Sequence, residues 1–151
     1  MIADLKRILI AEDNANDLEL TMAALDENRI ANEIIAVRDG AEAIDYLESR
    51  GRFAGRGTSN PALVLLDLKM PKVDGLEVLR YIKADARFRT IPVVMLTSSR
   101  EEQDLVRSYD LGVNAYVVKP VDFAEFMEAV RNLGGFWAVL NEVPRTSARP
   151  A

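Results

Sequence analysis

The stretch LVLLDLKMPKVDG (residues 63–75) decides the fold of this chain. Four consecutive apolar residues run directly into Asp67, and Pro71 and Gly75 follow. A continuous apolar run that ends in turn-forming residues is typical of a strand buried on both faces of a parallel sheet. Nothing in so apolar a strand requires a carboxylate at its end, so Asp67 is the first candidate for a functional residue.

Apolar, β-branched runs of this kind recur along the chain. They predict five strands, at residues 7–11, 33–37, 62–66, 91–96 and 115–119. Between them, apolar residues recur at helical spacing, as Leu18, Met22 and Leu25 do. Four helix starts carry a capping residue with Glu three positions on, and the capping residues are Asp39, Asp74, Ser99 and Asp122.

This alternation of strand and helix predicts the fold class. We expect an α/β domain with a doubly wound, five-stranded parallel sheet in the flavodoxin-like order 2-1-3-4-5. The 151 residues leave room for one domain with a proper core. We expect that domain over residues 1–143, with a helical extension from about residue 134, and a loose tail at residues 144–151. Residues 49–61 are predicted to form a surface loop.

Composition excludes several classes of function. The chain contains no histidine and no cysteine, which removes histidine-dependent hydrolysis, His-ligated zinc, thiolate metal sites and disulfides. A formal net charge of -5 with scattered basic residues argues against nucleic acid as a partner. No run is long and apolar enough for a membrane span, and no signal peptide is evident, so we expect a cytoplasmic protein.

Functional side chains follow four of the five predicted strands. Glu12 and Asp13 end the first, Asp67 the third, Thr97 the fourth and Lys119 the fifth. The carboxyl ends of parallel strands form the ligand-binding edge of such a sheet. Three neighbouring carboxylates need a compensating charge, and a hard divalent cation such as Mg²⁺ supplies it. The sequence thus predicts a Mg²⁺ site where the Asp67 nucleophile attacks a phosphoryl group that Lys119 and Thr97 stabilise.

Each of these residues also has a plainer interpretation by itself. An Asp after a strand is often a helix cap or turn former, and a Glu-Asp pair before a helix often only complements the helix dipole. A Thr can simply end a strand, and Lys-Pro commonly marks a turn. The conjunction of four consecutive strand ends that each carry a suitable group favours the functional interpretation.

This ordered set, with MPKVDG after Leu68-Lys69 and Ser98 after Thr97, resembles the receiver domains of two-component response regulators over residues 5–133. The resemblance implies that a sensor histidine kinase transfers its phosphoryl group to Asp67 in a Mg²⁺-dependent step. It also implies that the backbone carbonyl of Lys69 joins Glu12, Asp13 and Asp67 around the metal, and that Pro120 follows a cis peptide bond.

A narrower resemblance concerns the segments SRGRFAGRG, YDLGVNAYVVKP and GGFWAVLNEVP. They are similar to those of the small single-domain regulators that partner phytochrome-type kinases. The family resemblance further implies a switch in which Thr97 moves toward the phosphoryl group and Tyr116 turns inward. The alternative for Tyr116 is an alternating strand aromatic without a role in a switch, and the resemblance favours the switch.

Two further hypotheses concern Lys69 and the C-terminal aromatic pair. The Lys69 ammonium either points at the phosphoryl group and sets its lifetime, or is simply solvated. Phe136 and Trp137 either pack on their own domain or anchor a two-fold interface. The resemblance favours a homodimer through the helix after Ser99, the strand at residues 115–119, the helix after Asp122 and the C-terminal extension.

The alternatives are a degenerate receiver that binds partners without phosphorylation and an aspartate-nucleophile phosphohydrolase. The phosphohydrolases resemble D-x-D, whereas this chain has Asp67-Leu68-Lys69 and lacks the second acid. We therefore expect a signalling phosphoacceptor rather than an enzyme with a turnover substrate.

Overall fold

The computed structural model describes residues 7–27, 32–57 and 59–131. Five parallel strands form one sheet in the order β2-β1-β3-β4-β5, which confirms the predicted fold class and strand order. The elements run β1 Arg7–Ala11, α1 Ala15–Glu27, β2 Glu33–Val37, α2 Gly40–Glu48, the 3₁₀ helix η1 Gly51–Phe53, β3 Leu63–Asp67, α3 Gly75–Ala84, β4 Val93–Thr97, α4 Arg100–Ser108, β5 Ala115–Val118 and α5 Phe123–Arg131.

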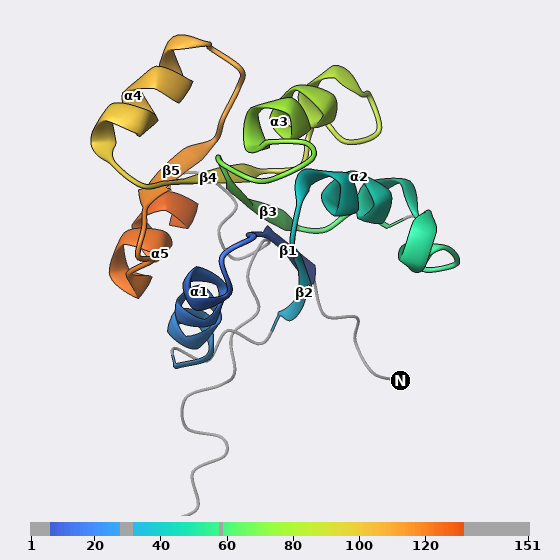
Figure 1. Cartoon of the computed structure of the whole chain (residues 1–151), viewed down its shortest axis with the longest axis horizontal. Coiled ribbons are helices and arrows are strands. Elements are labelled where there is room, and N and C mark those ends of the chain that lie inside the picture. Colours follow the sequence, from blue (N-terminus) through green and yellow to red (C-terminus); the bar gives the residue numbers. More distant parts are fainter. Residues whose placement is uncertain (1–6, 28–31, 58, 132–151) are drawn as a thin grey trace, which may run out of the picture.

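The helices cover both faces of the sheet (Figure 1). Alternate strand residues such as Leu9, Val64 and Met95 pack with α2, α3 and α4, while Ile10, Leu65 and others pack with α1 and α5. Every residue of β3 and of β4 is buried, which explains why these two runs read as continuously apolar. Such burial on both faces provides most of the driving force for the fold.

The predicted helix starts are confirmed. The side chains of Asp39, Asp74 and Ser99 each accept the backbone N–H three residues on, and at α3 Glu77 reciprocates in a full capping box. Asp122 likewise accepts the N–H of Glu125 at 3.0 Å. These caps satisfy N–H groups that have no partner inside their helices.

Strand bounds differ from the prediction by one or two residues. β3 covers residues 63–67 rather than 62–66, and β4 covers 93–97 rather than 91–96. Pro92 has no backbone N–H to contribute to a ladder, and β4 begins directly after it. The shift makes Asp67 and Thr97 the last residues of neighbouring strands, with Asp67 paired to Leu96.

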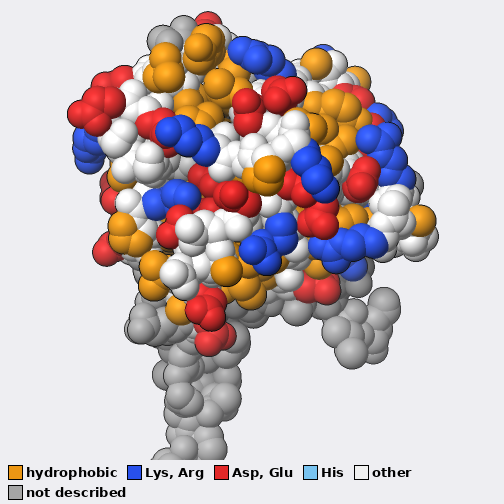
Figure 2. All heavy atoms as spheres, viewed as in Figure 1, with side chains coloured by type: hydrophobic (Ala, Val, Ile, Leu, Met, Phe, Trp, Pro, Cys, Tyr) orange, Lys and Arg blue, Asp and Glu red, His pale blue; other side chains and the backbone are white. Residues whose placement is uncertain are grey.

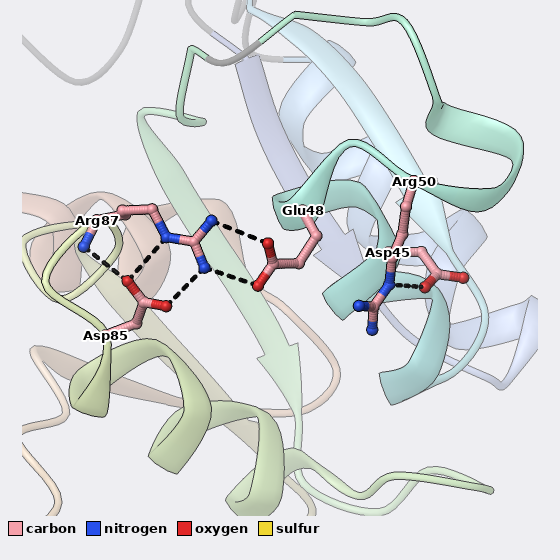
Figure 3. Close-up of polar contacts among 5 residues, drawn as sticks. All are labelled: Asp45, Glu48, Arg50, Asp85 and Arg87. Carbon is pink, nitrogen blue, oxygen red and sulfur yellow. Dashed lines mark hydrogen bonds and ion pairs between the residues drawn. The ribbon is translucent and has the colours of Figure 1, made fainter.

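The predicted loop at residues 49–61 contains the short helix η1 and is fastened to the domain. The Nε of Arg56 donates to the carbonyl of Tyr46 at 2.7 Å, and its guanidinium lies 3.8 Å from the centre of the Tyr46 ring. Nearby, Arg87 forms a two-bond ion pair with Glu48 and binds Asp85 as well (Figure 3). This network ties the turn before β4 to the end of α2, where the chain leaves for β3.

Some predictions concern residues outside the described ranges. The extension from about residue 134, the tail at residues 144–151 and the pair Phe136 and Trp137 all lie there. Within the described part, no helix is long and apolar enough to cross a membrane.

Candidate functional site

A cavity of about 280 Å³ opens at the carboxyl end of the sheet. Acidic side chains gather near the middle of the face seen in Figure 2, with basic side chains beside them. The structure brings the predicted acids and both predicted lysines together around this cavity. Its lining consists of Glu12, Asp13, Asn14, Asp17, Asp67, Lys69, Ser98, Glu102 and Lys119.

Three carboxylates form the floor and rim of the cavity. Glu12 and Asp67 are buried and Asp13 is exposed. One oxygen from each lies within 4.8 Å of the others. An all-oxygen donor set with an exposed rim suits a hard divalent cation that retains water ligands. The residues present therefore fit a Mg²⁺-type ion.

Lys119, the residue directly after β5, compensates this negative charge. Its Nζ lies 3.1 Å from Oδ1 of Asp67, 3.2 Å from Oε1 of Glu12 and 2.9 Å from Oδ2 of Asp17. Burial lowers the pKa of Lys119, but the hydrogen bond to Asp17 and the nearby carboxylates outweigh it and hold the pKa above its ordinary value. The lysine is thus a fixed cation in direct contact with Asp67.

Glu12 is the acid of this cavity whose pKa is raised by burial and by the neighbouring carboxylate. Burial, followed by hydrogen bonding with Asp67 and the charge of Asp67, raises the pKa of Glu12 to about 7. The N–H of Asn14 and the charge of Lys119 oppose the rise. A buried carboxylate next to another carboxylate favours its neutral form, as general electrostatics requires.

This shift predicts a pH dependence for the metal-free protein. Because the folded state raises the pKa of Glu12 from 4.5 to about 7, it binds this proton more tightly than the unfolded chain does. The free energy of unfolding should therefore fall as pH rises from about 4.5 to about 7, by about 3 kcal/mol. Urea unfolding in EDTA across this range measures the slope, and Glu12→Gln should flatten it. If the pH dependence persists in Glu12→Gln, other titrating groups must cause it.

Thr97 carries a hydroxyl without a partner. Its side chain is fully buried at the end of β4, and Oγ1 has no hydrogen-bond partner among the residues that the structure describes. Thr97 itself does not line the cavity, but the next residue, Ser98, does. Buried hydroxyl groups are nearly always paired, so an orphan at this strand end is available to a group that the site receives from outside.

Gly75 shapes the loop that follows Asp67. Its N–H donates to the carbonyl of Leu68 at 2.8 Å, and a Cβ at this position would lie 2.2 Å from the carbonyl oxygen of Asp67. Only glycine allows the start of α3 to approach the strand end this closely. The first helical residue of α3 and the backbone of Asp67 are therefore in contact.

Lys69 lines the cavity, whereas Tyr116 does not and lies in a separate hollow beside α4 and α5. The Lys69 ammonium is mostly exposed and lies 3.4 Å from Oε2 of Glu102. Tyr116 is partly buried, and the Arg107 guanidinium lies 4.5 Å from the centre of its ring. The Lys119-Pro120 peptide bond is cis.

Two acids at the site were missed by the sequence analysis. Asp17 lies in the first turn of α1 and Glu102 in the first turn of α4. Their spacing from helix starts shows only favourable charge at the positive end of a helix. Asp17 follows Asp13 by only four residues and lies in the first turn of the helix that leaves this edge, which was the single available signal that it would face the site.

Comparison with known proteins agrees with this geometry. Residues 8–131 match the family described as response regulator receiver domain. The solved bacteriophytochrome response regulator AtBRR is 61% identical, with a TM-score of 0.87 and coverage of 93% of this chain and 100% of that one.

Two curated relatives are more distant. Response regulator Rcp1 of Synechocystis sp. is 39% identical over 132 residues, covering 87% of this chain and 88% of the relative. Its Mn(2+)-bound form is a solved structure that is 37% identical, with a TM-score of 0.69 and coverage of 93% and 99%. The probable methanogenesis regulatory protein FilR2 of Methanothrix harundinacea is 42% identical over 137 residues, covering 91% and 86%. The chain belongs to the response regulator receiver domain family.

Proposed function

We propose that this protein is a stand-alone response regulator whose Asp67 accepts a phosphoryl group from a sensor histidine kinase in a Mg²⁺-dependent reaction. The observation that carries the proposal is the environment of Asp67, a buried strand-end carboxylate 3.1 Å from Lys119 and within reach of two further carboxylates. In the transfer, an Asp67 oxygen forms a bond to phosphorus while the bond between phosphorus and the kinase histidine breaks.

Glu12, Asp13, Asp67 and the backbone carbonyl of Lys69 are the proposed metal ligands. Receiver domains bind divalent metal at an acidic pocket, and Mg²⁺ is the ion that we propose for this chain. Bound there, it supplies positive charge that shields the nucleophile and the phosphoryl oxygens. The nearby carboxylates of Glu12 and Asp13 hold that charge beside Asp67.

Thr97 and Lys119 are the proposed partners of the transferred group. The unpaired Thr97 hydroxyl would donate to one phosphoryl oxygen, and the Lys119 ammonium would pair with another. We also propose that Thr97 and Tyr116 form the switch, with Tyr116 leaving its contact with Arg107 as Thr97 moves. Such a population shift typically involves a coupling of about 1–3 kcal/mol.

A phytochrome-type kinase is the proposed donor. The names of AtBRR and of several similar solved structures support it, because these proteins are phytochrome response regulators. FilR2 carries a different name at 42% identity, so the support comes chiefly from the higher identity to AtBRR. The output would consist of contacts with other proteins in the cytoplasm, with no role for nucleic acid.

Intact-mass analysis after incubation with acetyl phosphate tests the proposal. We expect a gain of one phosphoryl group that requires Mg²⁺ and maps to the peptide containing Asp67. Failure to bind Mg²⁺ and to gain mass would favour a degenerate receiver. Steady release of phosphate from a generic phosphate ester would favour the phosphohydrolase alternative.

Lys69 is proposed to shield the acyl phosphate from attacking water. Its ammonium lies at the cavity rim and can reorient toward a bound anion, because the side chain is 82% exposed. Lys69→Ala should therefore shorten the lifetime of phosphorylated Asp67 by about threefold. The decay of the phosphorylated mass after donor removal measures this lifetime, and an unchanged lifetime would refute the role.

We further propose a homodimer through α4, β5, α5 and the C-terminal extension, with Phe136 and Trp137 as anchors. Charges of both signs line this face, including Arg100, Arg107, Glu125 and Glu128, which suits a self-complementary contact. Sedimentation of the wild type and of Phe136→Ser with Trp137→Ser tests it. The double variant should sediment as a monomer, and a dimer of unchanged affinity would exclude these anchors.

A further inference from the structure

Glu102 reaches into the phosphoacceptor cavity from α4. Its side chain is only 11% exposed although it lies in the first turn of a surface helix. One carboxylate oxygen, Oε1, accepts the backbone N–H of Ser98 at 2.7 Å. The other, Oε2, lies 3.4 Å from the ammonium of Lys69. Both of these donors and Glu102 itself line the same cavity as Asp67.

The two donors held by Glu102 are of the kind that binds phosphoryl oxygens. Ser98 follows Thr97 directly and precedes the N-cap of α4, and Lys69 follows Asp67 by two residues. A backbone N–H just before a helix N-terminus and a nearby ammonium together favour an anion. Glu102 supplies that anion from the chain itself while Asp67 is unmodified.

Helix capping alone does not account for this arrangement. At α2, Glu42 accepts the N–H of Arg38 at 2.9 Å and pairs with Arg52, so the backbone bond is a recurrent feature of these helix starts. Glu42 does not line the cavity, and its basic partner Arg52 lies in η1 rather than after the phosphoacceptor. What distinguishes Glu102 is that both of its partners lie beside Asp67.

The net charge of the cavity affects how easily an anionic donor reaches Asp67. Five carboxylates line the cavity against two ammonium groups, so the negative charge is in excess. A phosphoryl donor is itself an anion and must approach Asp67 through this field. A negative charge in a cleft slows the entry of anions and is screened by salt.

We propose that Glu102 is an internal competitor of the phosphoryl group. In the unphosphorylated protein it occupies the Ser98 N–H and the Lys69 ammonium, which slows phosphoryl transfer from anionic donors. After Asp67 is phosphorylated, it releases both donors to the new anion. Glu102 is a positioning residue in this scheme, and the inference rests on the proposed function of Asp67.

Phosphorylation rates of two matched variants test the inference. Glu102→Gln keeps an oxygen for the Ser98 N–H and removes the charge, while Glu42→Gln makes the same change outside the cavity. Acetyl phosphate is the donor, and Mg²⁺ is present at a concentration that saturates the metal site of each variant. Under these conditions Glu102→Gln should be phosphorylated about fivefold faster than the wild type. Glu42→Gln should match the wild type.

A purely structural role would not produce the dependence on charge. The gain in Glu102→Gln should shrink as NaCl is raised, and it should be smaller with phosphoramidate, a donor of lower negative charge. Equal rates in Glu102→Gln and the wild type, or a gain independent of salt and donor, would overturn the inference. Absence of any uptake by the wild type would instead overturn the proposed function, and this inference with it.

Discussion

Replacing Asp67 with asparagine is expected to abolish phosphoryl uptake from acetyl phosphate and Mg²⁺. The amide cannot attack phosphorus as a carboxylate does, and Asp67 is the one described acid that is itself the last residue of a buried strand and contacts Lys119. Intact mass measures the loss. Asp104→Asn, on the exposed surface of α4, is the control with the same charge change. Residual uptake by Asp67→Asn would reveal a second acceptor.

The same substitution should stabilise the metal-free protein. Asp67 and Glu12 are both buried and repel each other, and the charge of Asp67 is one reason for the raised pKa of Glu12. Removing that charge relieves the repulsion, although Lys119 loses one of its three partners. Above pH 7, where Glu12 is ionised, we expect the free energy of unfolding in EDTA to rise by about 1–2 kcal/mol. Saturating Mg²⁺ should remove the advantage, because the variant loses a metal ligand.

Lys119→Met is expected to give the second largest effect. The lysine provides the only ammonium in contact with Asp67 among the described residues, and it is mostly buried. Loss of one fixed charge that stabilises a transferring group typically costs about a hundredfold or more in rate. A time course of phosphorylation at saturating Mg²⁺ should show such a loss. Lys72→Met, which removes an exposed ammonium paired with Asp39, should keep the wild-type rate.

Stability separates this role of Lys119 from simple misfolding. Without the ammonium, Glu12, Asp17 and Asp67 face one another with no positive charge between them. The metal-free variant should be less stable than the wild type, and Mg²⁺ should restore much of the difference by supplying charge. Restored stability together with a restored phosphorylation rate would show that Lys119 acts only on the fold.

Local signals explain how much of the fold was predictable. Strand runs and capping residues act over a few neighbours, so the order of elements and the caps at Asp39, Asp74 and Ser99 follow from the sequence. Strand ends were less certain, because periodicity does not specify where a ladder begins. The pairing of Asp67 with Leu96 depends on neighbouring strands, which a single run does not encode.

In the candidate site, too, some residues were predictable from the sequence and others depend on the packing of the fold. Residues at strand ends were predictable, since parallel topology brings those ends to one edge. Glu12 and Asp13 are adjacent in sequence, yet one is fully buried and the other exposed, and only the packed structure distinguishes them. Asp17 and Glu102 enter from helices, so their contacts with Lys119 and Lys69 depend on how those helices pack.

The close approach of Gly75 to Asp67 has a mechanical consequence. The start of α3 rests on the carbonyl of the phosphoacceptor residue without an intervening side chain, so it cannot shift relative to Asp67 without opening this backbone contact. By contrast, α4 contacts the site through the Glu102 carboxylate. This side chain can release the Ser98 N–H and the Lys69 ammonium without any change in backbone packing. Of the two helices that follow β3 and β4, α3 is therefore held against Asp67 and α4 is the one that can shift. Phosphorylation of Asp67 should therefore be transmitted to partner proteins through a movement of α4.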